Sequence, residues 1–286
     1  MLWHALGTPG ILQASPEGTL RQKLQRGMNP HYLYLTVDLA VLAVPLAFSF
    51  DRKVRFARFW PALFPAIAVM MALFIPWDIA FTEDSIWGFN EAYLSGIWIA
   101  GIPLEEWLFF ICIPYACVFT YESLKHYVPH PPLKSLALPL TLLLAVASAS
   151  LAIAYPERQY IATTCALTAL FCTALGLAAA SKPAVRQWNH RLWLAYLPLL
   201  VPFILSNGVL TGLDFWQYPV FNREVQDVAD QIVWYNNDHN LRIRIFSVPL
   251  DDLIYGFLMI AMTIISYELI AKKIGLVTGS PPAARP

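Results

Sequence analysis

Long uninterrupted apolar blocks are the feature that most restricts what this 286-residue chain can fold into. Several of them reach the roughly 20 residues that a helix needs to cross the hydrocarbon core of a bilayer. Only 13% of the residues are charged and the mean hydropathy is +0.53, whereas a soluble domain carries roughly a quarter charged residues. The sequence therefore predicts an all-α, polytopic membrane bundle.

Seven candidate spans are delimited by prolines and charged residues at their ends. They cover, within a few residues, 31–50, 58–80, 103–124, 133–155, 159–180, 191–213 and 249–271. Most lysines and arginines lie on the face that holds loops 51–57, 125–132 and 181–190 and the C-terminal tail. The positive-inside tendency predicts that this face is cytoplasmic and that the N-terminus lies outside.

Charge and cysteine usage exclude several classes of protein. The net charge is zero and no basic domain is evident, which argues against nucleic acid as a partner. The four cysteines fall inside apolar blocks, without CxxC spacing or a nearby histidine cluster. We therefore expect neither a disulfide framework nor a metal site.

Two segments of the chain repeat each other without a gap. Residues 103–122 read PLEEWLFFICIPYACVFTYE, and residues 249–268 read PLDDLIYGFLMIAMTIISYE. Asn90 and Asn236 each lie 13 residues before the proline that opens the segment. This pattern predicts two three-helix repeats, spans 1–3 and 5–7, joined by a connecting fourth helix. The added span gives both repeats the same orientation, so both acidic pairs are expected at the same membrane face.

The chain is accordingly divided into five predicted parts. They are an N-terminal interfacial segment (1–30), a first three-helix repeat (31–124), a connecting helix (125–158), a second three-helix repeat (159–271) and a C-terminal tail (272–286).

The acidic pairs Glu105–Glu106 and Asp251–Asp252 are the candidate catalytic residues. Taken alone, a proline followed by two acids is an ordinary helix N-terminus, where carboxylates oppose the helix dipole. Three features favour a functional site instead: the motif occurs twice, each copy has two acids, and both lie where carboxylates are costly. Asp78, near the same face, is a further catalytic candidate.

Other polar residues inside the spans have two interpretations. Asp38 and Asn207 are candidates for function, since polar groups in membrane helices are costly, but hydrogen bonding between helices is an alternative. Glu122 lies 17 residues beyond Glu105, about 25 Å along a helix. We therefore exclude Glu122 and its counterpart Glu268 from the site, and we interpret the preceding tyrosines, Tyr121 and Tyr267, as interfacial anchors.

Paired carboxyl groups among aromatic rings suggest proton chemistry on an apolar substrate. Neighbouring carboxyls in a dry site cannot all ionise, so a protonated acid can donate to an alkene and a carboxylate can later take a proton back. A carbocation between these steps needs ring faces rather than water. The substrate-binding candidates are Trp107, Phe110, Asn90, Asn236, Tyr255 and Asn207. For the aromatic residues, a lipid-facing or core position is an equal alternative.

Three stretches carry a resemblance to a known family: PLEEWLFF, the preceding FTEDSIWGFN…YLSGIWIAGI, and IVWYNNDHNLRIRIFSVPLDDLIYGF. They resemble the heterodimer-type lycopene cyclases, in the fused single-chain form, over about residues 32–124 and 191–270. The resemblance implies cyclisation of the acyclic ends of lycopene to β-ionone rings, an isomerisation without net redox. It implies proton donation by Glu105 or Glu106. Asp251 and Asp252 are then partner, base or cation stabiliser, and PLDD departs from the usual motif because Asp is shorter by one methylene.

The resemblance also implies partners and leaves alternatives open. We expect a linear carotenoid substrate, the bilayer of the cell membrane and other carotenoid enzymes as partners. No cofactor is expected, since no GxGxxG follows a strand. The alternatives are an ε- or γ-type or C50 carotenoid cyclase and, from another class, a proton-coupled transporter. A retinal receptor is disfavoured because span 7 has no lysine before Lys272.

Overall fold

A computed structural model describes residues 30–129, 132, 134–223 and 228–276. The predicted N-terminal segment, except Pro30, and the last ten residues of the predicted tail lie outside the described residues. Within the described part, seven helices are long and apolar enough to cross a membrane. The all-α, polytopic fold is confirmed, and the chain is an integral membrane protein.

The long helices are α2 (Leu33–Phe48), α3 (Trp60–Glu83), α4 (Leu104–Tyr127), α5 (Lys134–Ala154), α6 (Gln159–Ser181), α7 (Pro183–Thr211) and α8 (Leu250–Lys273). Short 3-10 helices are η1 (Pro30–Tyr32), η2 (Phe56–Phe59), η3 (Glu91–Tyr93) and η4 (Phe215–Gln217). The strands are β1 (Trp87–Phe89), β2 (Trp98–Ile99), β3 (Ile102–Pro103), β4 (Phe221–Asn222), β5 (Val233–Tyr235), β6 (Arg244–Ile245) and β7 (Val248–Pro249). Helix α7 begins well before the predicted start near residue 191, because Pro183 suits the first helical turn.

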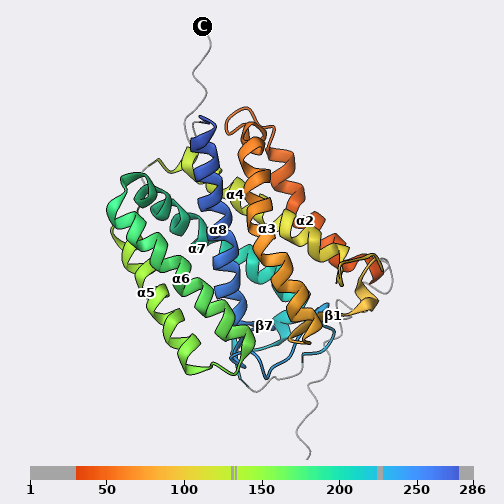
Figure 1. Ribbon diagram of the computed structural model, residues 1–286. Helices are drawn as coiled ribbons and strands as arrows, with labels where there is room; N and C mark the ends of the chain where they lie inside the picture. Colours follow the sequence, from red (N-terminus) through yellow and green to blue (C-terminus); the bar gives the residue numbers. More distant parts are fainter. Residues whose placement is uncertain (1–29, 130–131, 133, 224–227, 277–286) are drawn as a thin grey trace, which may run out of the picture.

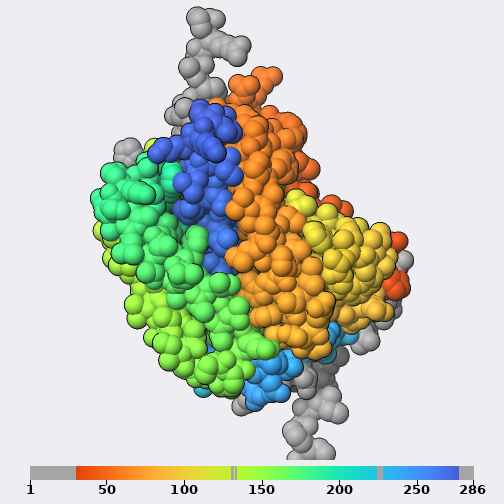
Figure 2. Space-filling model, in the orientation of Figure 1, coloured from red at the N-terminus to blue at the C-terminus, as the bar shows by residue number. Residues whose placement is uncertain are grey.

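The helices form a bundle with α5 and α6 on one side, α2 on the other, and α3 and α8 between them (Figure 1). Helix α5 packs along α6, α3 along α8, and α2 along α4. In Figure 2, α3 (orange) and α8 (blue) lie side by side and close one face of the bundle. Helices α4 and α8, which carry the acidic pairs, are the most enclosed of the seven.

Two equivalent strands join the first repeat (α2, α3, α4) to the second (α6, α7, α8). Strands β1 and β5 occupy matching places, offset by 146 positions as Pro103 is from Pro249. They pair antiparallel, and the register is Trp87↔Tyr235, Gly88↔Trp234 and Phe89↔Val233. Equivalent strands that pair antiparallel about their central residues are what a two-fold relation between the repeats requires. Gly88 allows the close approach, because a Cβ at this position would lie 2.3 Å from the ring of Trp234.

Asn90 and Asn236 form hydrogen bonds between the two repeats, beside the paired strands β1 and β5. The side chain of Asn90 donates to the carbonyl of Gln231 (3.3 Å), and that of Asn236 donates to the carbonyl of Ser85 (3.4 Å). Their backbone N–H groups donate to Ile232 and Ile86 at 2.8 and 2.9 Å. Ser85 and Gln231 are themselves equivalent positions, so the repeats exchange the same bonds. Asn90 and Asn236 therefore link the two halves.

A tight hairpin precedes each acid-bearing helix. Strands β2 and β3 pair in front of α4, and β6 and β7 pair in the same way in front of α8, where β4 adds a third strand. Each turn holds a non-glycine residue with positive φ, Ala100 at 51° and Phe246 at 55°. Such φ values are uncommon for residues with a side chain. Their occurrence in both turns indicates that the hairpins fix where α4 and α8 begin.

A buried polar cluster lies at the far ends of α4 and α8, where the sequence predicted interfacial anchors. The hydroxyl of Tyr121 donates to Glu268 (2.6 Å), and that of Tyr267 donates to Glu122 (2.9 Å). The ammonium of Lys125 forms ion pairs with both glutamates. Both tyrosines are fully buried, so the prediction that they anchor the protein at the membrane surface is wrong. Their hydroxyls cross between the repeats and satisfy carboxylates that would otherwise be costly to bury.

The junction at Gly88 predicts a stability effect. We expect Gly88→Val to lower the free energy of unfolding by about 1–3 kcal/mol, because the added side chain must displace the ring of Trp234. Thermal unfolding of the purified protein in detergent measures this loss. Ala92→Val, at an exposed position of the nearby η3, is the matched control and should leave the unfolding midpoint unchanged. Equal midpoints for both variants would contradict the role given to this contact.

Candidate active site

The first acid of each pair holds the loop that precedes its helix. Glu105 accepts a hydrogen bond from the backbone N–H of Ser95 at 2.7 Å. Asp251 accepts from the backbone N–H of Leu241, with both carboxylate oxygens at 3.2 Å. Ser95 and Leu241 lie ten positions before their acids, so the two contacts are equivalent. Both carboxylates are fully buried.

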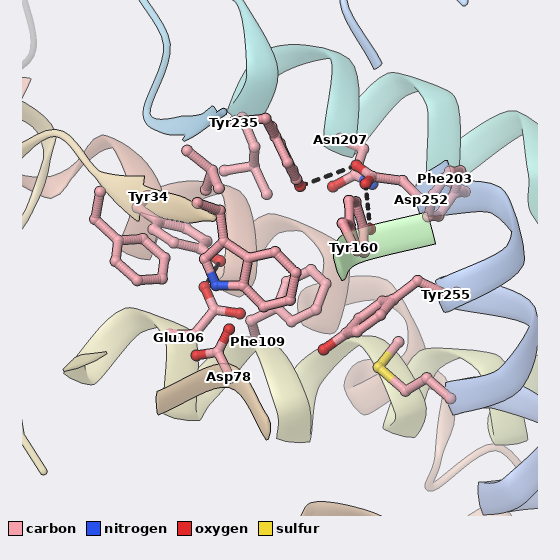
Figure 3. A pocket seen from close by; sticks show the side chains of 16 residues that line it. Tyr34, Asp78, Glu106, Phe109, Tyr160, Phe203, Asn207, Tyr235, Asp252 and Tyr255 are labelled. Atoms are coloured by element: carbon pink, nitrogen blue, oxygen red, sulfur yellow. Dashed lines mark hydrogen bonds between the residues drawn. The ribbon is translucent and has the colours of Figure 1, made fainter. Parts of the chain in front are cut away.

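The second acid of each pair faces a common cavity. Glu106 and Asp252 both line a pocket of about 50 Å³ that is shared between the two repeats. Asp78 of α3 lines it as well, and Figure 3 shows Asp78 and Glu106 together on one side with Asp252 on the other. The structure thus brings together three of the five predicted catalytic residues, while Glu105 and Asp251 lie outside the pocket lining.

The Glu106 side of the pocket is rich in acids. The hydroxyl of Tyr34 donates to Glu106 Oε2 at 2.6 Å. One helical turn after Tyr34, Asp38 is fully buried on the same helix, and neither of its oxygens has a hydrogen-bond partner among the described residues. Unpartnered buried carboxyls are rare, because they forfeit the hydrogen bonds that water would make. The cluster of Glu106, Asp78 and Asp38 is therefore a place where protons can be held.

The Asp252 side is rich in donors instead. The hydroxyl of Tyr160 donates to Oδ1 at 2.6 Å, and the hydroxyl of Tyr235 donates to Oδ2 at 3.0 Å. The amide of Asn207 adds a long contact of 3.5 Å to Oδ2. Burial, reinforced by the charge of Asp252, raises the pKa of the Tyr235 phenol well above its usual value, so this group stays a donor. Dashed lines in Figure 3 mark the bonds to the tyrosines.

A buried arginine adds positive charge near the second acidic pair. Arg244 of β6 is 1% exposed and donates to the carbonyl of Ser247 (2.6 Å) and to Asn237 Oδ1 (2.9 Å). Burial lowers the pKa of Arg244, while the nearby charges of Asp252 and Asp251 oppose that shift. The equivalent position in the first repeat is Trp98, which is exposed. The surroundings of the two acidic pairs therefore differ in charge although the backbones of the hairpins match.

Aromatic rings form much of the remaining wall. The ring centre of Trp87 lies 5.1 Å from that of Tyr160 and 6.0 Å from that of Tyr255. Tyr160 stacks on Tyr235 with centroids 5.9 Å apart. Phe109 and Phe203 also line the space. The faces of such rings attract positive charge, so they can stabilise a transient cation.

Four predicted substrate-binding residues lie outside the pocket lining, whereas Tyr255 and Asn207 are part of it. Trp107 donates its indole N–H to the carbonyl of Ile99 at 3.2 Å. Phe110 is fully buried and packs on Phe74, with ring centres 6.1 Å apart. Asn90 and Asn236 bind backbone carbonyls at the junction of the repeats, as described above.

Several residues of the pocket were not among the predicted site residues. Tyr34 and Tyr160 hold equivalent places near the start of the first helix of each repeat, and each donates to the second acid of a pair. The sequence signal that could have found them is the alignment of span 1 on span 5, where both tyrosines open an apolar helix. Tyr235 and Trp87 come from the paired strands β5 and β1. Their place in the pocket depends on that pairing.

Comparison with known proteins agrees with this architecture. A family model described as lycopene cyclase matches residues 31–124 and 157–270. A bifunctional lycopene cyclase/phytoene synthase from Podospora anserina is 27% identical over 100 residues. The aligned stretch is 35% of this chain and 16% of that relative, so it spans a small part of the relative's length. No solved structure matches the chain. Because the family model covers most of both repeats, the chain belongs to the lycopene cyclase family.

Proposed function

We propose that this protein cyclises the acyclic ends of lycopene to β-ionone rings, by adding and removing a proton without net redox. The observation that carries the proposal is the shared pocket, where a carboxyl from each repeat faces the other half among aromatic rings. Membership of the lycopene cyclase family supports the substrate class. The enzyme acts in the cell membrane, where a linear carotenoid dissolves in the bilayer and other carotenoid enzymes supply it.

Glu106 is the proton donor in this proposal. Among the described residues its carboxyl receives a hydrogen bond from Tyr34, and its other neighbours in the pocket include the acid Asp78. Carboxyl groups that lie together away from water cannot all carry charge, so at least one of them keeps its proton. A neutral acid in such a place is suited to protonate an alkene.

Asp252 is the base. Its two oxygens receive hydrogen bonds from Tyr160, Tyr235 and Asn207, and Arg244 contributes positive charge. Each of these groups stabilises the ionised carboxylate more than the neutral acid. Glu106 is therefore protonated and Asp252 is ionised in this proposal, although the two residues occupy equivalent places in the repeats.

The reaction then proceeds in three balanced steps. The proton of Glu106 adds to the terminal double bond of the acyclic end, whose electron pair forms the new C–H bond and leaves a tertiary cation. The electron pair of the internal double bond forms the ring C–C bond and moves the cation onto the ring. Asp252 takes a ring proton, and the released pair becomes the ring double bond. A proton returns from Asp252 to Glu106 before the next turnover, so atoms and electrons balance.

The aromatic wall protects the intermediate. Trp87 and Tyr255 present ring surfaces, which attract cations without reacting as water does. The cavity volume of about 50 Å³ leaves room for few water molecules, since a cavity needs roughly 10–15 Å³ of such volume to hold one. The substrate end must displace side chains as it enters, and this displacement expels the remaining water.

Glu105 and Asp251 act by position rather than by contact with substrate. Each holds the N-terminal loop of its helix, which fixes the rotation that points Glu106 or Asp252 into the pocket. Asn90 and Asn236 serve the same end by linking the repeats. The transporter alternative fits less well, since the acids lie at the starts of the continuous helices α4 and α8 rather than at broken helices.

Removing either acid of the pocket should stop the reaction. We expect Glu106→Gln and Asp252→Asn each to lower the cyclisation rate by about 10²-fold or more, the usual contribution of a general acid or base. Expression in a lycopene-accumulating bacterium, followed by chromatography of the pigments, measures the loss. Glu91→Gln, an exposed acid in η3, is the matched control and should give wild-type pigments. Normal cyclisation by both pocket variants would refute the mechanism.

The neighbouring acid should behave differently. Glu105→Gln keeps an oxygen that can accept from Ser95, so we expect activity within about tenfold of wild type and a lower unfolding midpoint. Pigment analysis and thermal unfolding of the same preparation separate the two effects. If Glu105→Gln removes activity as completely as Glu106→Gln while the midpoint stays unchanged, Glu105 is itself the donor.

The tyrosine that orients the base should influence which proton leaves. Tyr235→Phe removes a hydrogen bond to Asp252, and we expect about tenfold slower cyclisation together with ε- or γ-ring products. The ring types are distinguished by chromatography and absorption spectra. Tyr34→Phe, which changes the donor side, should slow the reaction without altering the ring type. An identical product mixture from both variants would argue against Asp252 as the base.

A further inference from the structure

A second, larger cavity adjoins the pocket of the acids. It has a volume of about 250 Å³ and lies between α2, α4 and α7. Phe109, Phe203 and Asn207 line both spaces, so the two cavities share part of their walls. We call this second space the α2–α4–α7 groove.

The groove is long and apolar. Along α4 its wall runs from Phe109 through Ile113 and Ala116 to Thr120, a distance of about 16 Å at the rise of an α-helix. Helix α2 contributes Pro45 at the far end. The groove therefore leads from the carboxyl groups toward the opposite end of the bundle.

The two repeats can be placed in register through their contacts. Tyr34 on α2 and Tyr160 on α6 make the same bond to the second acid, which aligns these two helices. In the pocket, Asp78 on α3 lies on the side of Glu106, and Asn207 on α7 lies on the side of Asp252 (Figure 3). These two residues therefore align α3 with α7. This register also places Phe74 opposite Phe203. Phe74 packs on Phe110, and Phe203 lies against the equivalent Gly256.

In this register, three small residues of the groove correspond to large apolar residues at matching positions between α6, α8 and α3. The replacements are Phe171 for Pro45, Met262 for Ala116 and Trp77 for Ser206. Phe171 and Met262 pack against the core, and the ring centre of Trp77 lies 5.1 Å from that of Tyr255. These three larger side chains narrow the matching space in the other half, so the two halves differ at the groove.

We infer that the α2–α4–α7 groove holds the polyene tail of a linear carotenoid whose end lies between Glu106 and Asp252. This inference rests on the proposed function. A long hydrocarbon chain needs an elongated apolar channel beside the reacting groups, and the groove is elongated, apolar and separated from the pocket only by walls that the two cavities share. Pro202, on its wall, is exposed on the apolar surface of α7 between Val201 and Phe203, which gives the tail access from the lipid.

Ala116→Met tests the inference, because it introduces the residue that fills the equivalent place in the second repeat. Two substrates are compared with purified full-length protein in lipid vesicles: lycopene, and a truncated analogue that keeps one acyclic end and lacks most of the tail. We expect Ala116→Met to lower kcat/KM for lycopene about tenfold or more, since added methylenes in a fitted channel cost that much. For the truncated analogue it should stay within about twofold of wild type. Ala147→Met, on the exposed face of α5, should change neither value.

Two outcomes with active wild-type protein would overturn the inference. Equal losses on both substrates would mean that residue 116 does not act through the tail, and no loss on lycopene would mean that the tail lies elsewhere. If wild-type protein cyclises neither substrate, the proposed function fails. Pigment binding then tests separately whether the groove holds a polyene tail. Protein purified from lycopene-accumulating cells should carry lycopene, and Ala116→Met should carry several-fold less. Unchanged pigment content would mean that the tail lies elsewhere, and a lipid acyl chain that lycopene does not displace would assign the groove to lipid.

Discussion

An odd number of crossings in each three-helix repeat would turn the second repeat upside down if the two were joined directly, and α5 prevents this. With the extra crossing, α4 and α8 begin at the same end of the bundle, beside the strands that precede them. Every other feature of the site depends on this common orientation. The pairing of β1 with β5, the exchanged asparagine bonds and the shared pocket all require equivalent loops to meet at one end.

Under the proposed function, each acidic pair has one acid with a structural role and one with a chemical role. The first carboxylate accepts a hydrogen bond from a backbone N–H ten residues upstream. The second lies about 100° further around the helix and lines the pocket. The proposed chemistry then depends on differences between two similar halves. Tyr235, Asn207 and the buried Arg244 gather around Asp252, whereas Glu106 shares its side with Asp78. Two copies of one motif can in this way hold opposite protonation states within one cavity.

Much of this arrangement could be predicted from the sequence, since apolar blocks and a gapless repeat are properties of the chain itself. The seven spans and the common face of the acids follow from block length and crossing number. The different surroundings of Glu105 and Glu106 could not be predicted, because adjacent residues on a helix differ only in rotation, and that rotation depends on how the preceding β2–β3 hairpin packs. The buried cluster of Tyr121, Glu268 and Lys125 was not predicted either. Tyrosine near a span end is typical of a membrane surface, and only tertiary packing reveals its burial.

The larger side chains opposite the groove matter for a substrate with two identical ends. Under the further inference, the described residues offer the polyene tail one groove, although the helices that form it are repeated. Under the proposed function, a pigment closed at one end has to depart, turn end for end in the bilayer and dock again before its other end can react. The product with one ring is then released into the membrane. The ratio of pigments with one and two rings depends on how fast this product binds again, compared with how fast other enzymes bind it.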